Sequence, residues 1–186
     1  LSLLGVGFFL SQNQYFAALW QAEGVDLVAY VENIYAGPRL AYAWAGWDIY
    51  LSHPWLGVGL GASGFYFYSA LPDWSHFNLS EISILLSPEY TGFPNVKNLY
   101  IRLLAEGGIL SFWVWMAFYF YIFSRILVLL RSNRQYLRFV AVAGAFAFFS
   151  ILLTNFTMDS FAMPFLWLPL GVILGILEGN GQADSR

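Results

Sequence analysis

Three long stretches of this chain are almost free of charge and are as long as a membrane crossing. They comprise residues 109–130, 139–157 and 160–177, and only the first contains a charged residue, Arg125, near its end. A helix needs about 20 mostly apolar residues to span a bilayer. Only 10% of the 186 residues are charged, against about a quarter in an ordinary soluble domain. We therefore expect an all-α integral membrane protein, a transmembrane helix bundle.

The basic residues predict which ends of these helices face the cytoplasm. Segment 131–138 carries three arginines and no acid, so the positive-inside rule makes it a cytoplasmic loop. The next turn, at Asp159, then faces outward, and residues 11–108 form a long external loop. The apolar run at 1–10 is too short to span, so we expect it to end a truncated helix that is preceded by missing N-terminal helices. Residues 178–186 form a cytoplasmic tail in this topology.

The long external loop is too aromatic to remain unfolded in water. Pro38 begins a predicted amphipathic helix that ends at residues 52–54. A second short helix is predicted over 98–106, and it ends at Gly107 and Gly108. The apolar face of the first helix consists of Leu40, Trp44, Trp47 and Leu51. We expect these helices to fold onto the membrane face or against the bundle.

Composition and spacing exclude several kinds of chemistry. The chain has no Cys, and its two His residues have neither a helical partner nor a paired acidic motif, so no metal site or hydrolase triad is predicted. A net charge of −3 without a basic surface gives no nucleic-acid partner. The glycines at 59, 61 and 64 match the dinucleotide fingerprint, but they do not join a strand to a helix. We expect a tight turn there instead, with close backbone packing and amides offered to an anion.

Few cations are found among the many acids of the external segment. Arg39 stands at the predicted helix start, where it and the helix end could hold an anionic ligand together. Alternatively, Arg39 is an interfacial arginine that snorkels to the headgroups. Arg102 has Glu106 one turn later, and we expect a simple surface pair between them.

Two sequence blocks then resemble a known family. The first runs from Asp48 through His53-Pro54-Trp55-Leu56-Gly57 to Gly61, and the second runs from Asn98 through Glu106 to Gly108. Their order and spacing on one long external loop resemble the O-antigen ligase and polymerase family of bacterial membrane proteins. The resemblance covers roughly residues 38–177.

This resemblance implies a metal-independent glycosyltransferase without a cofactor in the bacterial cytoplasmic (inner) membrane, with its main loop facing the periplasm. Such enzymes transfer a glycan from a polyprenyl diphosphate carrier to a hydroxyl of another glycan or of lipid A core. External arginines bind the carrier diphosphate in this family, and Arg39 matches that position. Fixed cations suit a departing diphosphate because they stabilise its developing charge.

One departure from the family pattern concerns the residue before Asn98. Many ligases have a His there, whereas this chain has Lys97, which favours a polymerase. A charged Lys97 that clamps phosphate costs less free energy than a neutral lysine base. We therefore predict substrate binding by Arg39, Lys97, Arg102 and Asn98. The candidate bases, between which the sequence does not choose, are His76, His53, Glu81 and Glu89.

Two further function classes stay open at this point. A polysaccharide or lipid transporter would carry ionisable residues within its spans, and these spans are nearly free of charge. A non-catalytic scaffold would use the aromatic loop only to dock a partner.

Overall fold

The computed structural model describes residues 37–85, 87, 89, 94–159 and 164–183, and this part of the chain is helical with no strand. The predicted truncated span at 1–10 lies outside the described residues. The helices are α4 (Gly37–Ser52), the 3₁₀ helix η1 (Ser63–Tyr66), α5 (Phe67–Ala70), α6 (Asp73–Asn78), α7 (Ser80–Leu85), α8 (Leu99–Leu130), α9 (Gln135–Thr154) and α10 (Pro164–Ala183).

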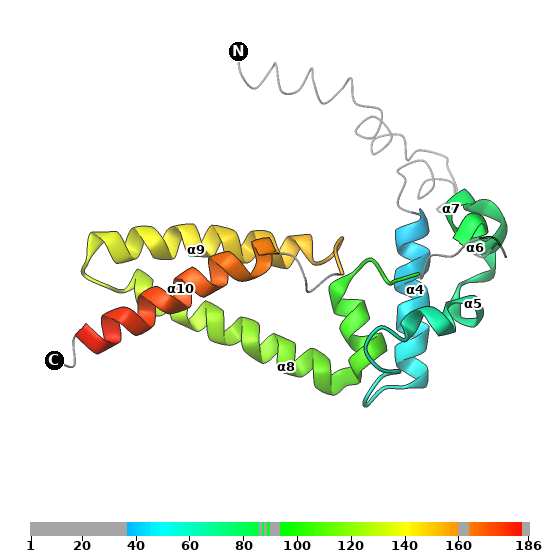
Figure 1. The fold of residues 1–186 in the computed structure, drawn as a ribbon, viewed down its shortest axis with the longest axis horizontal. Helices are drawn as coiled ribbons and strands as arrows, with labels where there is room; N and C mark the ends of the chain where they lie inside the picture. Colours follow the sequence, from blue (N-terminus) through cyan, green and yellow to red (C-terminus); the bar gives the residue numbers. More distant parts are fainter. Residues whose placement is uncertain (1–36, 86, 88, 90–93, 160–163, 184–186) are drawn as a thin grey trace, which may run out of the picture.

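The described helices form two groups, each with its own core (Figure 1). Helices α8, α9 and α10 lie side by side in a long body whose buried centre includes Ile122, Ile126 and Phe148. Helices α4 to α7 gather beside the beginning of α8, around Tyr42, Phe67 and other buried side chains. Helix α8 takes part in both groups and connects them.

Helix α8 is broken into two arms at Gly108. This residue has φ 65° and ψ −170°, which is far from helical geometry. The short arm, 99–107, packs beside α4, and the long arm, 109–130, packs against α9 and α10. The break coincides with the end of the short helix that the sequence predicts at Gly107 and Gly108.

Two described helices, α8 and α9, are long and apolar enough to cross a membrane. Only 22% and 28% of their most apolar windows are buried, whereas the core helix of a soluble protein is mostly buried. Large side chains such as Phe120 and Phe146 project outward from them. This pattern suits helices surrounded by lipid.

The helix ends differ from the predicted span ends. Helix α9 begins at Gln135 instead of 139, which leaves only a short connection after α8, and it ends at Thr154 instead of 157. Helix α10 begins at Pro164 and continues to Ala183, although the apolar run ends at Leu177. Hydrophobicity marks the part of a helix that suits lipid, whereas polar residues such as Arg138 can extend the helix into water.

The predicted amphipathic helix is α4, with the expected start and end. Its large apolar side chains, which include Trp44 and Trp47, are exposed. The opposite face, which carries smaller side chains such as Ala41, Ala45 and Ile49, is buried against the rest of the group. The small residues allow α8 and α5 to approach α4 closely, so the tryptophan face is left outward.

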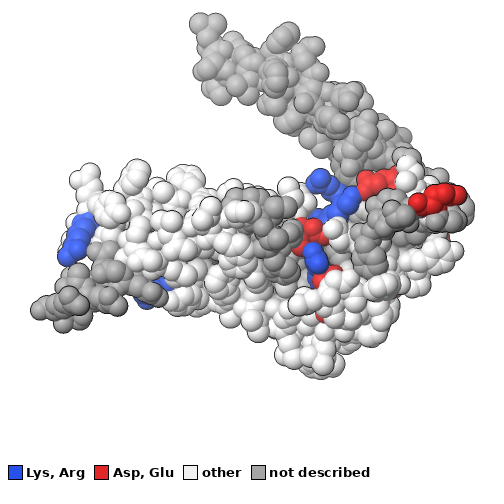
Figure 2. All heavy atoms as spheres, in the orientation of Figure 1, with Lys and Arg blue, Asp and Glu red and all other residues white. Residues whose placement is uncertain are grey.

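Among the described residues on the face that Figure 2 draws, charged side chains lie at the ends of the long body. Basic side chains are seen at one end, where Arg131 and Arg134 follow α8 in the sequence. Acidic and basic side chains occur together at the other end, near α4 and the short arm of α8. The second end is where charged side chains can form a site.

Candidate functional site

The first sequence block folds into a glycine loop, residues 53–62, that lies directly on the break in α8. The amides of Val58 and Gly59 donate to the carbonyls of Ala105 and Glu106 at 3.0 and 2.9 Å, and the amide of Ile109 donates to the carbonyl of Pro54 at 2.8 Å. The backbone carbonyls freed at the break thus find partners in the loop. The two blocks of the predicted family pattern are therefore in direct contact.

This contact depends on the absence of side chains at two glycines. Gly57 has φ 64°, and a Cβ there would lie 2.4 Å from the carbonyl carbon of Glu106. A Cβ on Gly108 would lie 2.2 Å from the carbonyl oxygen of Trp55. Since both obstacles are backbone atoms, neither position has room for another residue.

Glu106 is the centre of the contact, and it is only 2% exposed. Its carboxylate accepts hydrogen bonds from the amide of Gly61 at 2.9 Å, from Ser63 Oγ at 2.7 Å and from Arg102 Nε at 3.0 Å. The sequence predicts that the glycine turn offers an amide to an anion. It does so, and the anion is the Glu106 carboxylate of the same chain. A buried carboxylate needs partners of this kind to offset the loss of water.

The predicted pair between Arg102 and Glu106 is present, but the prediction that it lies on the surface is wrong. The pair forms, but the Arg102 side chain is only 22% exposed and the Glu106 side chain 1%. Arg102 also donates from Nη1 to the carbonyl of Asp159 at 2.8 Å. It is an internal link between the glycine loop and the residues that follow α9.

Asn98, another predicted binding residue, uses both ends of its side-chain amide within the fold. Its Oδ1 accepts from the amide of Ile101 at 3.1 Å and caps α8, as Asn commonly does at a helix start. Its Nδ2 donates to the carbonyl of Phe156 at 3.1 Å. These contacts assign Asn98 a role in joining α8 to the end of α9.

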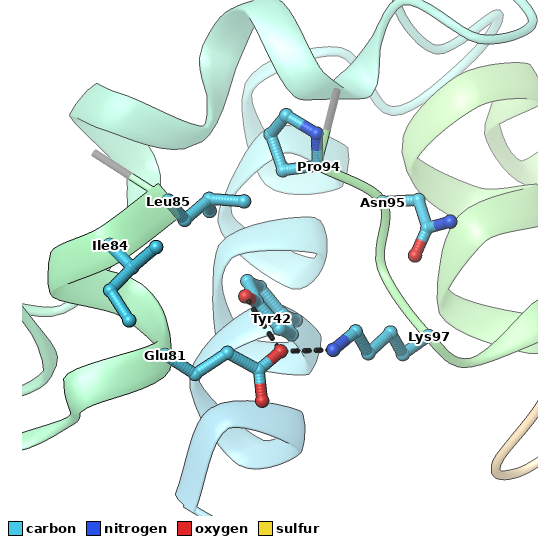
Figure 3. A pocket seen from close by; sticks show the side chains of 7 residues that line it. All are labelled: Tyr42, Glu81, Ile84, Leu85, Pro94, Asn95 and Lys97. Carbon is cyan, nitrogen blue, oxygen red and sulfur yellow. Dashed lines mark hydrogen bonds and ion pairs between the residues drawn. The ribbon is translucent and has the colours of Figure 1, made fainter. Parts of the chain in front are cut away.

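A cavity of about 270 Å³ lies beside this framework, between α4, α7 and the segment that leads into α8 (Figure 3). Tyr42, Glu81 and Lys97 point toward one another inside it. Glu81 Oε1 accepts a hydrogen bond from Tyr42 OH at 3.2 Å and forms an ion pair with Lys97 Nζ. The cavity is lined by Tyr42, Glu81, Ile84, Leu85, Pro94, Asn95 and Lys97.

Lys97 is held firmly at the edge of this cavity. Its backbone has φ 53°, a conformation that residues other than glycine seldom adopt. Its amide donates to Asp159 Oδ2 at 3.2 Å, and its ammonium group lies 4.8 Å from the centre of the Tyr42 ring. The ammonium group is therefore positioned by the backbone, a carboxylate and an aromatic face.

The remaining predicted site residues lie around the cavity or away from it. Arg39 is exposed in the first turn of α4, three residues before Tyr42, so the two are neighbours on the helix surface. His53 contacts the Tyr66 ring at 5.5 Å, and His76 lies 6.2 Å from the Tyr68 ring. Neither histidine lines the cavity, and Glu89 is exposed. Of the candidate bases, Glu81 is the one that the cavity contains.

Two residues that hold the site together, Tyr42 and Glu106, were not among the predicted site residues. Tyr42 could have been found, because it follows Arg39 at the spacing of helix neighbours. Glu106 precedes two glycines at a predicted helix end, but the sequence does not show that its partners are 43 and 45 residues away. Among the described residues, no three His, Asp or Glu side chains are grouped so that they could hold a metal ion.

Comparisons with protein-family models, with curated proteins and with solved structures gave no match. The interpretation of the site therefore depends on its own geometry and on the resemblance of the two sequence blocks.

Proposed function

We propose that this chain belongs to a glycosyltransferase of the bacterial cytoplasmic membrane that takes a glycan from a polyprenyl diphosphate carrier outside the cytoplasm. The observation that carries the proposal is the cavity in which an acid, Glu81, meets a cation, Lys97, against Tyr42, which lies one helical turn after Arg39 in α4. The two resembling sequence blocks interlock beside it, and apolar helices of membrane-spanning length lead away from it.

The proposed reaction joins an acceptor hydroxyl to the anomeric carbon of the donor glycan. The hydroxyl oxygen forms the new bond, its proton passes to the Glu81 carboxylate, and the bond from the anomeric carbon to the phosphate oxygen breaks. The electron pair leaves with the polyprenyl diphosphate. A carboxylate can act as a general base, and a positioned general base contributes about 10²- to 10⁴-fold to a reaction rate.

Lys97 and Arg39 would hold the diphosphate in this reaction. Lys97 is paired with Glu81, and a bound diphosphate would offer it a more highly charged partner. An exchange of partner by Lys97 would leave the Glu81 carboxylate able to accept the proton. Arg39 is exposed at the start of α4, where its guanidinium and the helix end both favour an anion.

The acceptor that we propose is another carrier-linked glycan, so that the product is a polymer. A fixed lysine before Asn98 serves the diphosphate better than it serves as a base, since an ammonium group donates hydrogen bonds and has no lone pair to accept a proton. Glu81 supplies a separate base in the same cavity. This division of roles does not need the histidine that many ligases have at that position.

The test uses the full chain in liposomes with a polyprenyl-diphosphate-linked oligosaccharide, and products are separated on a gel. We expect a ladder of polymers that Arg39→Gln reduces about 100-fold, the usual effect of removing one such stabilising group. Arg39→Lys should retain part of the activity. Arg131→Gln, which removes the same charge at the opposite end of α8, is the matched control and should leave the ladder intact.

The other outcomes identify the alternatives. An Arg39-dependent adduct that forms only when lipid A core is added would make the enzyme a ligase. No product with either acceptor would overturn the proposed transfer reaction and would favour a transporter.

A further inference from the structure

The glycine loop presents large apolar side chains on its outer side. Trp55, Leu56 and Leu60 are 70%, 73% and 79% exposed. No charged residue occurs from Pro54 to Pro72. Exposed apolar surface of this density is typical of a site that contacts lipid or another protein.

The loop is fixed at the level where the long arm of α8 begins. The bond from the Ile109 amide to the Pro54 carbonyl, 2.8 Å, joins the loop to the first residue of that arm. Leu110, Trp113 and Val114, in the first turns of the arm, are exposed as well. If the arm crosses a bilayer, the loop must lie at the edge of the same bilayer.

The backbone of the loop is also suited to a place with little water. An amide without a partner is costly in lipid, but most of the loop amides are bonded within the protein. The donors are Gly57 to the His53 carbonyl, Val58 to Ala105, Gly59 to Glu106, Gly61 to the Glu106 carboxylate and Ala62 to the Gly59 carbonyl. Three of these five donors turn toward α8 and two bond within the loop, whereas the large apolar side chains of the loop are exposed.

We propose that the glycine loop inserts into the lipid bilayer, with Trp55, Leu56 and Leu60 at the boundary between headgroups and acyl chains. Lipid is favoured over a protein partner because the surface is uncharged, carries an indole ring of the kind enriched at membrane interfaces, and continues a helix of membrane-spanning composition. This inference needs no glycosyl transfer, and it can hold or fail independently of the proposed function.

The absence of cysteine from the chain permits a direct test with single-cysteine variants. Leu60→Cys, in the full chain, is labelled with an environment-sensitive fluorophore and reconstituted into phosphatidylcholine liposomes. Phe120→Cys, on the exposed side of the long arm, and Asn133→Cys, in the connection between α8 and α9, are the depth controls. Quenching is measured with iodide in the water and with lipids that carry a nitroxide near the headgroup or deep in the chain.

We expect the label at 60 to emit at shorter wavelength than the label at 133 and to be quenched most by the shallow nitroxide. The deep nitroxide should quench the label at 120 most, and iodide should quench the label at 133. Leu56→Cys should repeat the result for 60, and an unchanged circular dichroism spectrum shows that each variant is folded.

Three results would overturn the inference. One is iodide quenching at 60 as strong as at 133, which would place the loop in water. Another is protection of the label at 60 from both kinds of quencher, which would mean that protein covers the loop. The third is a label at 120 that no nitroxide lipid reaches, because the long arm would then not lie in the bilayer.

Discussion

The buried carboxylate of Glu106 lies 2.9 Å from the amide nitrogen of Gly61, which is 45 residues earlier in the chain. The same oxygen, Oε2, accepts from Arg102, while Oε1 accepts from the Ser63 hydroxyl. One side chain thus holds the glycine loop, the 3₁₀ helix η1 and the short arm of α8 together. Its removal should have a larger effect than the removal of any exposed acid.

We predict that Glu106→Ala lowers the free energy of unfolding by about 3–5 kcal/mol, because it leaves Arg102 without its buried partner. Glu106→Gln should cost only about 1–2 kcal/mol. Its oxygen can replace Oε2, and its amide group can donate to the Ser63 hydroxyl. The measurement is thermal unfolding in detergent, followed by circular dichroism.

Glu89→Gln is the matched control for these variants, since Glu89 is exposed. It should change the stability by less than about 0.5 kcal/mol. Equal losses for the Ala and Gln variants at 106 would contradict the assigned hydrogen bonds.

Alanine substitutions at three glycines should form a graded series. Gly108→Ala should be the most harmful, because its Cβ would meet the Trp55 carbonyl oxygen at 2.2 Å. Gly61→Ala meets no atom within 4 Å but keeps a φ of 77°, so we expect a loss of about 1–2 kcal/mol from backbone strain alone. Gly175→Ala, in an open position within α10, should stabilise the chain by about 0.5–1 kcal/mol.

The same unfolding experiment ranks these three variants. If Gly61→Ala were as harmful as Gly108→Ala, close contact between the loop and α8 would not be the reason for glycine at 108.

Two substitutions at Asn98 separate its capping role from its link to α9. Asp also caps helices well but cannot donate to the Phe156 carbonyl, whereas Ala does neither. Asn98→Asp should therefore lose about 1 kcal/mol, and Asn98→Ala about 2 kcal/mol. Hydrogen exchange at the first amides of α8 should rise in the Ala variant and change little in the Asp variant. A rise of the same size in both variants would contradict the cap.

The charge of Lys97 can be removed with little change to its backbone. Asn is one of the residues that adopt positive φ most easily. The free energy of unfolding of Lys97→Asn should therefore lie within about 1 kcal/mol of that of the parent. We predict that it nevertheless lowers glycan transfer about 10- to 100-fold, the equivalent of one hydrogen bond to a charged group. Lys97→Arg should retain more activity than Lys97→Asn in the same gel assay. Full activity of the Asn variant would remove Lys97 from the proposed site.

Local patterns in the sequence predicted the four long helices but not the contacts between them. Pro38, the apolar spacing of α4 and the glycines at 107 and 108 each act on their immediate neighbours, so their effects could be foreseen. The bond between Glu106 and Gly61 and the pairing of Lys97 with Glu81 join distant segments, which no local pattern specifies. The short helices α5, α6 and α7 were missed because each has six residues or fewer, too few to show a helical period.

The break at Gly108 also determines how movement can pass between the two helix groups. The Ile109 amide donates a hydrogen bond to the Pro54 carbonyl beside the break. The angle between the two arms of α8 is therefore held by the glycine loop and is not free to change. Helices in membranes tilt to match the thickness of the bilayer. If the long arm spans a bilayer, a change in lipid chain length that tilts this arm would swing the short arm like a lever, and the cavity wall at Lys97 would move with it.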